Sequence, residues 1–398
     1  MLRKILYITL ITISSSWATT LDEIVNKVIE NNQDLKSLSK AVEVSNQQIE
    51  LSNNWKNPVL TFGVNDIQFD DVTKRDLEPM QAQYVGFSQI IPTGNKLDLQ
   101  ENIAKSDKKI SAFALDNRKL ELKSKVYEYV YNILIFEKKY ELLIKYQNNI
   151  QKLEELSNAF YENGKMKQSD ILKIKILHSK IELRKVNLKN LINNLYLKLE
   201  ELTFISIDKI EASLKPRSVS FDGDMEDHPK ILMTKEFSTK FNTLSKYEKA
   251  NKNSDWKVNV AYFNRDSKYE DYANISVNIP LSFYDTEDTK SIKAKLKSQE
   301  AMSKLDNLKQ KFKISTKTLL NNIDKATKKY AILKETMIPL QEDVQTNLES
   351  YNSFSQVSPQ ESIKNLNEVI SYEMMLLDEL KDYFTSYSKL TYFTQGKI

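Results

Sequence analysis

Apolar residues recur every three or four positions through two long stretches of the chain. Between positions 95 and 215 there is no proline and only one glycine, Gly164. Such a stretch, rich in Lys, Leu, Glu and Ile, favours helix over long distances. The pattern predicts a helix over 97–160, a break at 161–164, and a second helix on which the seam resumes at Ile171. A seam close to a heptad step is typical of helices that pack as coiled coils.

The second half of the chain repeats this design. Its apolar seam runs from Leu305 to Tyr351, a break follows over 352–358, and a further helix starts at Pro359. Pro339 lies inside the outgoing helix. It should kink that helix, because proline removes a backbone hydrogen bond and clashes with the preceding turn.

Matching landmarks divide the chain into two repeats. Trp55 precedes a short alternating segment in the first half, as Trp256 does in the second. We therefore predict a first repeat over 19–215 and a second over 216–398, each with a short helix, a strand pair and a long helical hairpin. The shorter amphipathic helices that open the repeats are expected over 21–53 and 227–253.

Four short segments alternate apolar and polar residues with the period of a β-strand. They lie at 60–64, 85–91, 256–262 and 275–283. One apolar and one polar face suits a wall between lipid and water, but it also fits a soluble hairpin that packs on its own core. In lipid, open sheet edges are not tolerated. Because the smallest barrels have about eight strands, a membrane role predicts that two or more chains share one barrel.

The N-terminus has the pattern of an export signal. Arg3 and Lys4 precede a short apolar run, and Ala18 ends a small-residue cleavage pattern, so we expect a signal peptide over 1–18. Its removal leaves a chain that is close to neutral. We therefore expect no nucleic-acid partner, because a nucleic-acid footprint needs a basic excess.

The chain has no cysteine and only two histidines, His178 and His228. Disulfides and thiolate ligands are thereby excluded, and a metal site would have to be built from carboxylates, which suit hard ions better than transition metals. We predict no metal site and no cofactor. The sequence also offers no glycine-rich loop and no serine-nucleophile motif, so we do not expect an enzyme.

Several local motifs follow one another in a characteristic order. They are Trp55-Lys56-Asn57-Pro58, the segment 85–96, Tyr161-Glu162-Asn163-Gly164-Lys165 and the segment 169–172. In this order and spacing the chain resembles the TolC-like outer-membrane efflux proteins over essentially the whole mature sequence. The resemblance implies a mixed α/β membrane protein, mainly α, in which two-repeat helical hairpins form a trimeric α-helical barrel. Four strands per chain would build a twelve-stranded outer-membrane β-barrel.

The resemblance also implies a periplasmic aperture lined by acidic residues just past the helical turns. Asp170 matches that position in the first repeat, and Glu361 is the nearest match in the second. Plainer roles stay open, because Ser358 and Glu361 form a capping box and the helix dipole favours a carboxylate such as Asp170 near a helix start. The second turn departs from the family pattern, since 353–356 lacks the usual glycine. The expected adaptor-docking tips are Asn163, Gly164, Lys165, Phe354, Ser355 and Gln356.

These expectations together describe a passive conduit. The resemblance implies a homotrimer in the lipid of the outer membrane of a Gram-negative bacterium, with a periplasmic helical extension that meets an adaptor protein and an inner-membrane pump. Small toxic compounds or metal ions would leave through it. Two alternatives stay open. An outer-membrane channel of type I protein secretion has the same fold, and a soluble periplasmic coiled-coil scaffold shares the helical pattern.

Overall fold

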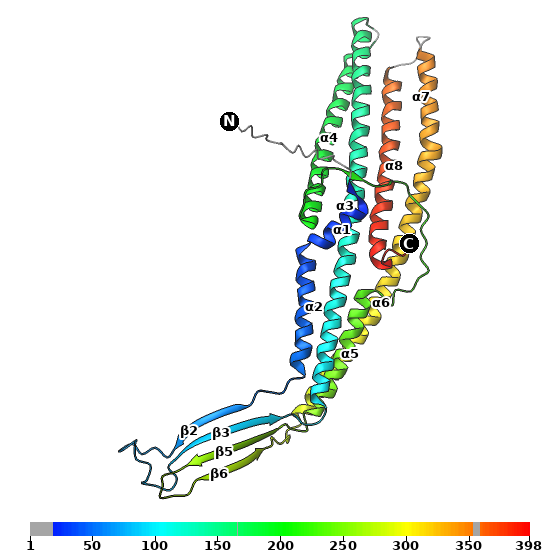
Figure 1. The fold of residues 1–398 in the computed structure, drawn as a ribbon. Coiled ribbons are helices and arrows are strands. Elements are labelled where there is room, and N and C mark those ends of the chain that lie inside the picture. Colours follow the sequence, from blue (N-terminus) through cyan, green and yellow to red (C-terminus); the bar gives the residue numbers. More distant parts are fainter. Residues whose placement is uncertain (1–18, 165, 353–358) are drawn as a thin grey trace, which may run out of the picture. The chain divides into compact units, whose positions relative to one another are not determined.

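The structure is mainly helical, and its elements follow the same order twice (Figure 1). The computed structural model describes residues 19–164, 166–352 and 359–398. Each round has a shorter helical part, two strands, a long helix and a returning helix. The helices are α1 Leu21–Asn31, α2 Gln33–Ser52, α3 Lys96–Glu162, α4 Gln168–Thr203, α5 Pro229–Ala250, α6 Thr286–Ile332, the π-helical η1 Leu333–Met337, α7 Ile338–Asn352 and α8 Pro359–Thr394. The strands are β1 Thr19–Thr20, β2 Val59–Asn65, β3 Ala82–Ile91, β4 Ile210–Glu211, β5 Trp256–Asn264 and β6 Tyr272–Asn278.

The first long helix and its break are confirmed. α3 has 67 residues, which at 1.5 Å per residue makes it about 100 Å long. It ends at a turn in which Gly164 has a φ of 69° and donates its N–H to the Tyr161 carbonyl at 2.9 Å. This left-handed conformation favours glycine, because a Cβ would be strained there.

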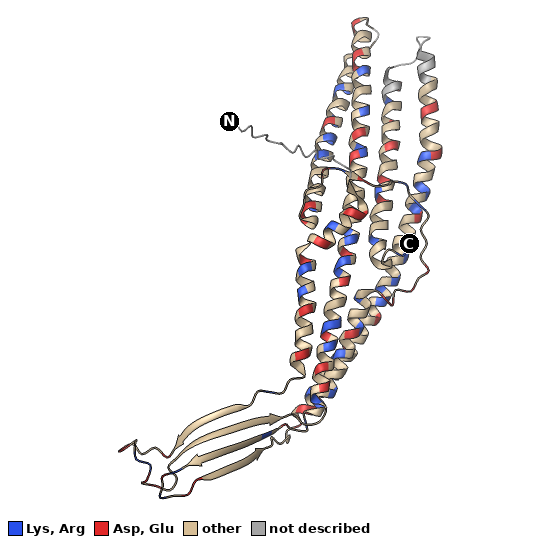
Figure 2. Ribbon diagram, viewed as in Figure 1, with Lys and Arg blue, Asp and Glu red and all other residues tan. Residues whose placement is uncertain are grey.

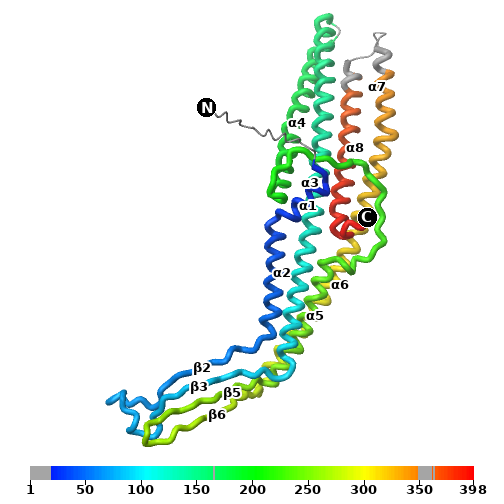
Figure 3. Tube along the Cα trace, in the orientation of Figure 1, coloured from blue at the N-terminus to red at the C-terminus, as the bar shows by residue number. Residues whose placement is uncertain are grey.

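Contacts group the chain into two compact units that do not coincide with the two repeats. One unit holds the described residues up to Lys36 together with Arg118–Met225 and Lys311–Ile398, and the other holds Ser37–Asn117 and Glu226–Gln310. Each unit therefore takes elements from both repeats. The long helices α3 and α6, which can be followed in Figure 3, contribute a part to each unit.

The core of the first unit joins helices from both halves of the chain. Tyr131 of α3 stacks on Phe384 of α8 with ring centroids 4.0 Å apart, and Ile323 of α6 belongs to the same buried cluster. Tyr383 of α8 donates its hydroxyl to the Arg217 carbonyl at 3.0 Å, which fastens the connection between α4 and α5 to this core. Aromatic stacking and apolar burial thus hold the helices together.

A ladder of serines joins α5 and α6 within the second unit. The hydroxyls of Ser238 and Ser298 lie 2.9 Å apart, and those of Ser245 and Ser291 lie 3.0 Å apart. Ser298 also donates to the Ser238 carbonyl at 2.8 Å, across the helix pair. Small side chains at the contact allow this close approach, because the distance between packed helices depends on the side chains between them.

The helix expected over 21–53 is interrupted, so that expectation is wrong in detail. The chain leaves helical geometry at Asn32, which has a ψ of 122° and is 4% exposed. Its side-chain oxygen accepts from the N–H of Asp34 at 3.1 Å, and its amide donates to the Leu202 carbonyl at 3.1 Å. Asn32 therefore ends α1, caps α2 and bonds to the end of α4, so specific hydrogen bonds hold the chain at this break.

The predicted disturbance near Pro339 takes the form of a π-helical segment. η1 covers Leu333–Met337 and ends two residues before the proline. Because Pro339 has no N–H to donate one turn back, the preceding carbonyls change partners, and a π-bulge is one of the known outcomes.

The last strand is shorter than expected, so the extension of the segment 275–283 to Phe283 is wrong. β6 ends at Asn278, which pairs with Lys257. Two residues later Pro280 has no N–H for a ladder bond, so pairing stops although the apolar alternation continues. Leu281 and Phe283 are exposed beyond the strand.

Candidate functional site

The four predicted strands form one antiparallel sheet. Its order is β2-β3-β5-β6, so the first strand pair lies beside the second through β3 and β5 (Figure 1). β2 and β6 are the two outer strands, and among the described residues each has a neighbouring strand on one side only. Unpaired backbone groups along such edges are available to another chain.

The strands are nearly free of charge, in contrast to the helices (Figure 2). Lys257 of β5 is the one ionisable charge among the residues of β2, β3, β5 and β6. The connections 66–81 and 265–271, at one end of the sheet, contain twelve Asp, Glu, Lys and Arg residues. A nearly charge-free band with charged loops at its end is typical of a strand region that lies in lipid.

The register of the sheet separates an apolar face from a polar one. Strand partners on the apolar face include Phe62 with Val85, Phe87 with Val260, and Val260 with Ile275. Phe62 is 74% exposed and Ile275 72% exposed. Positions on the polar face are Thr61, Gly86, Ser88, Asn259, Ala261, Asn274, Ser276 and Asn278, among others. Exposed apolar side chains this numerous on one face mark a surface that meets lipid or another protein.

Gln81 organises the longer connection and was not anticipated from the sequence. Its buried side chain accepts from the N–H of Leu77 at 2.9 Å and donates to the Lys74 carbonyl at 3.0 Å. Arg75 reaches the next strand pair, where it donates to the Asn264 carbonyl at 2.9 Å. These partners are backbone groups, so no residue pattern in the sequence indicates them.

The end of the first helical hairpin carries several of the predicted site residues. Asp170 lies in the first turn of α4 with its side chain 4% exposed, and its carboxylate pairs with Lys173 at 3.0 Å. Asn163 and Gly164 are exposed at the turn between α3 and α4. Lys165 lies outside the described residues.

The second hairpin end is described only in part. Glu361 lies in the first turn of α8 and is exposed, so it does not share the buried position of Asp170. The predicted tip residues Phe354, Ser355 and Gln356 and the predicted capping residue Ser358 lie outside the described residues, as does the predicted signal peptide 1–18.

Polar side chains link α3 and α4 along the hairpin. Lys185 donates to the Gln147 side-chain oxygen at 2.6 Å and lies 3.1 Å from Glu182. The amide nitrogen of Gln147 lies 3.2 Å from Nε2 of His178. His178 thus has a packing partner on the helix seam, and His228 caps the start of α5 by accepting from the Lys230 N–H.

Two half-buried acids lie in the same seams. Burial raises the pKa of Glu137, while the Tyr196 hydroxyl, which donates to it at 2.9 Å, acts in the opposite direction. Burial likewise raises the pKa of Glu373, and Lys145 opposes that shift. Both carboxyls serve as polar cross-links between helices, because each lies against a neighbouring side chain and not in an enclosed pocket.

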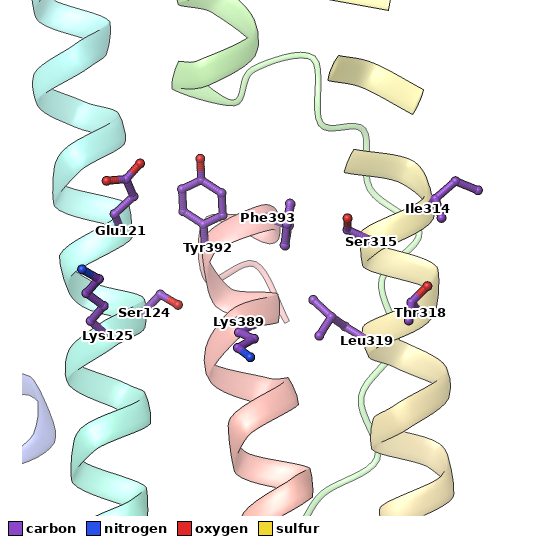
Figure 4. A pocket seen from close by; sticks show the side chains of 10 residues that line it. All are labelled: Glu121, Ser124, Lys125, Ile314, Ser315, Thr318, Leu319, Lys389, Tyr392 and Phe393. Carbon is purple, nitrogen blue, oxygen red and sulfur yellow. The ribbon is translucent and has the colours of Figure 1, made fainter. Parts of the chain in front are cut away.

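A groove lies between α3, α6 and α8 in the first unit (Figure 4). Its volume is about 580 Å³. Glu121 and Lys125 line it from α3, Leu319 from α6, and Lys389 and Tyr392 from α8. The lining mixes apolar and charged groups, and nothing in the structure indicates an occupant, so we assign it no ligand.

Neither a metal centre nor a membrane-spanning helix is found in the described part of the chain. Within residues 19–164, 166–352 and 359–398, no three His, Asp or Glu side chains are grouped so that they could hold an ion. No helix among these residues is both long and apolar enough to cross a bilayer.

Solved structures with a similar arrangement of elements include outer-membrane channels. The CmeC channel of Campylobacter jejuni superposes with a TM-score of 0.78 at 14% identity, covering 94% of this chain and 85% of that chain. The open MtrE channel of Neisseria gonorrhoeae gives 0.75 at 13% identity, covering 94% and 88%. The outer-membrane protein VceC of Vibrio cholerae gives 0.77 at 10% identity, covering 94% and 95%. No family model and no curated protein matches the sequence.

The chain therefore has the fold of these outer-membrane channels. The TolC-like fold that the sequence motifs implied is confirmed, including the strand pair and long helices in each half. At identities of 10–14% the likeness concerns the fold.

Proposed function

We propose that this chain is one protomer of a homotrimeric outer-membrane duct of a Gram-negative bacterium. An inner-membrane pump, joined to it by a periplasmic adaptor, would drive small toxic compounds or metal ions through it. The sheet carries the proposal, because its nearly charge-free strands have one exposed apolar face and, within the described part of the chain, two unpaired edges. Three chains that pair their edges into one barrel would turn the apolar face to lipid and leave no edge open.

The helical hairpins support the same proposal. Charged residues of both signs are interspersed along them (Figure 2), which suits helices that stand in water. The hairpin end with exposed Asn163 and Gly164 is the proposed adaptor contact, and Asp170 beside it is the proposed aperture residue. Two of the similar solved structures are outer-membrane channels, and we propose that this chain, too, conducts and does not catalyse.

A soluble scaffold fits the described residues less well. It would need a cover for the apolar face, and Phe62, Phe87 and Ile275 are exposed in the described chain. A channel for type I protein secretion would have the same sheet and hairpins. Deletion of the gene would distinguish these two roles. If the chain serves efflux, the cells should become sensitive to small toxic compounds; if it serves secretion, they should fail to export a protein.

The direct test is to express the full-length chain in a Gram-negative host and extract the outer membrane with detergent. Oligomer mass and single-channel conductance are then measured on the same preparation. We expect a membrane-embedded trimer with small gated currents. A monomer or dimer that dissolves without detergent and carries no current would overturn the duct and favour the scaffold.

A further inference from the structure

One register line of the sheet carries aromatic rings on three of its four strands. Tyr84, Phe263 and Tyr272 are direct partners across β3, β5 and β6. The Phe263 ring stacks on Tyr84 with centroids 5.1 Å apart and on Tyr272 with centroids 4.7 Å apart. The fourth position is Gly63 of β2, where a side chain would collide with the Tyr84 ring. The three rings therefore extend over all four strands.

This aromatic row lies on the polar face of the sheet. The next line along the same face consists of the small residues Thr61, Gly86, Ala261 and Asn274. Within the four described strands, all other rings occupy the opposite face, namely Phe62, Phe87, Trp256 and Tyr262. A water-filled barrel has a polar interior, so a row of rings is the exception that needs a cause.

The row is at the end of the sheet where the charged connections 66–81 and 265–271 begin. Arg265 places its guanidinium 5.2 Å from the Tyr272 ring centroid and is held there by bonds to the Glu270 carbonyl at 2.6 Å and the Pro79 carbonyl at 3.2 Å. Phe263 is 9% exposed, whereas Tyr84 and Tyr272 are partly exposed. The two tyrosines are thus the rings that a solute can reach.

Assembly would place the rows of three protomers around one lumen, an inference that rests on the proposed trimer. Strands in a closed barrel tilt and are staggered along one another, so the three rows cannot join into a flat ring. Each row nevertheless covers all four strands of its own protomer. Three rows together would therefore line the whole circumference with aromatic groups near one end.

We propose that the three rows form an aromatic collar at the loop end of the lumen, and that this collar is a contact site for planar, uncharged organic solutes. Flat solutes stack on any aromatic face, so such a site tolerates many structures. Because conduction requires a solute to leave again, the contact must be weak. A purely mechanical brace between strands would use the same stacking but would leave solutes unaffected.

The test uses the full-length trimer in a planar bilayer, with caffeine added on the loop side as a planar neutral probe. We expect millimolar caffeine to interrupt the current of the unmodified channel, and glucose, which is not planar, to have no such effect. The variant Tyr84→Leu/Tyr272→Leu should bind caffeine at least about tenfold more weakly, since two stacking surfaces are lost. The matched control Phe62→Leu/Phe87→Leu removes two rings from the opposite face and should retain the unmodified affinity.

The outcomes separate the collar from the duct itself. Rescue of the caffeine effect by Tyr84→Phe/Tyr272→Phe, which restores the rings without hydroxyls, would support the collar. If the double leucine variant does not assemble, Tyr272→Leu on the outer strand alone is measured against the same criterion. Currents that caffeine does not interrupt, or interrupts equally in all variants, would overturn the collar and leave the duct intact. Absence of a trimer and of any current would instead overturn the proposed function.

Discussion

The Asp170 side chain is buried, whereas that of its ion-pair partner Lys173 is exposed. Its side chain is 4% exposed, whereas that of Lys173, 3.0 Å away, is 65% exposed. A carboxylate in such a position needs compensating charge or donors, and both the lysine and the first turn of α4 supply them. Asp170 therefore stabilises the start of α4 at the hairpin end. The proposed aperture role would be a second role beside this structural one.

Replacing Asp170 by Ala should raise the resting conductance of the trimer. The hairpin end loses an ion pair, and the proposed aperture loses a negative charge, while helix stability falls by about 0.3–1 kcal/mol. Asp170→Asn keeps the shape and should reduce cation preference, whereas Lys173→Met keeps the carboxylate and should preserve it. Single-channel recordings in a KCl gradient measure both quantities. Unchanged conductance and selectivity in correctly assembled Asp170→Ala trimers would remove this residue from the aperture.

At the scale of elements, the sequence predicted what depends on local pattern. α3 was predictable because 95–215 contains no proline and one glycine. The break at Asn32 was not predictable, because Asn32 forms a hydrogen bond with Leu202, which is far away in the sequence. Alternation continued past Asn278, but Pro280 ended the pairing. The aromatic row needed a register that only the folded sheet supplies.

The same limit applied to the candidate site. Asp170 could be placed near a helix start from the sequence, because Gly164 marks the preceding turn. The burial of its side chain beside Lys173 could not be predicted from the sequence, because exposure depends on how α3, α4 and α8 pack. Glu361, the nearest match to Asp170 in the second half of the chain, is exposed, so the two predicted positions do not share an environment.

The serine ladder gives a prediction for the α5–α6 pair. Ser298→Leu should lower the free energy of unfolding by about 1–3 kcal/mol, because a large side chain forces the closely packed helices apart. Ser298→Ala removes only hydrogen bonds and should have an effect of about 1 kcal/mol. Thermal unfolding of the detergent-extracted protein, followed by circular dichroism, ranks the stabilities of the two variants. The control is Ser303→Leu at an exposed position of α6; if it destabilises as strongly as Ser298→Leu, close packing is not the cause.

For the whole molecule, the decisive feature is that the sheet ends in two open strands. β2 and β6 each lack a second neighbour within the described chain, and neither is shielded by charge, since both consist of uncharged residues. Proteins usually protect such edges with charges, prolines or a covering element. Such an edge can pair with the open edge strand of another protein. A second copy of this chain provides an edge strand of that kind.

This arrangement predicts which strands meet between protomers. The natural chain has no cysteine, so introduced thiols report only the intended contact. Because barrel closure staggers the strands by an amount that one chain does not reveal, Thr61→Cys on β2 is combined in turn with Asn274→Cys, Ser276→Cys or Asn278→Cys on β6. Oxidation in the outer membrane should give a covalently closed trimer on denaturing gels for at least one combination.

The controls follow from the strand order. Each single-cysteine variant carries thiols on one edge only and should stay a monomer on the gel. Ser88→Cys with Ser276→Cys combines a thiol on an inner strand with one on an edge, and β5 separates the two within the chain. It should also give no closed trimer, since a disulfide needs Cα atoms about 4.4–6.8 Å apart. A trimer of proven mass that no β2–β6 combination can link would mean that the protomers meet through their helices, and the shared barrel would have to be abandoned.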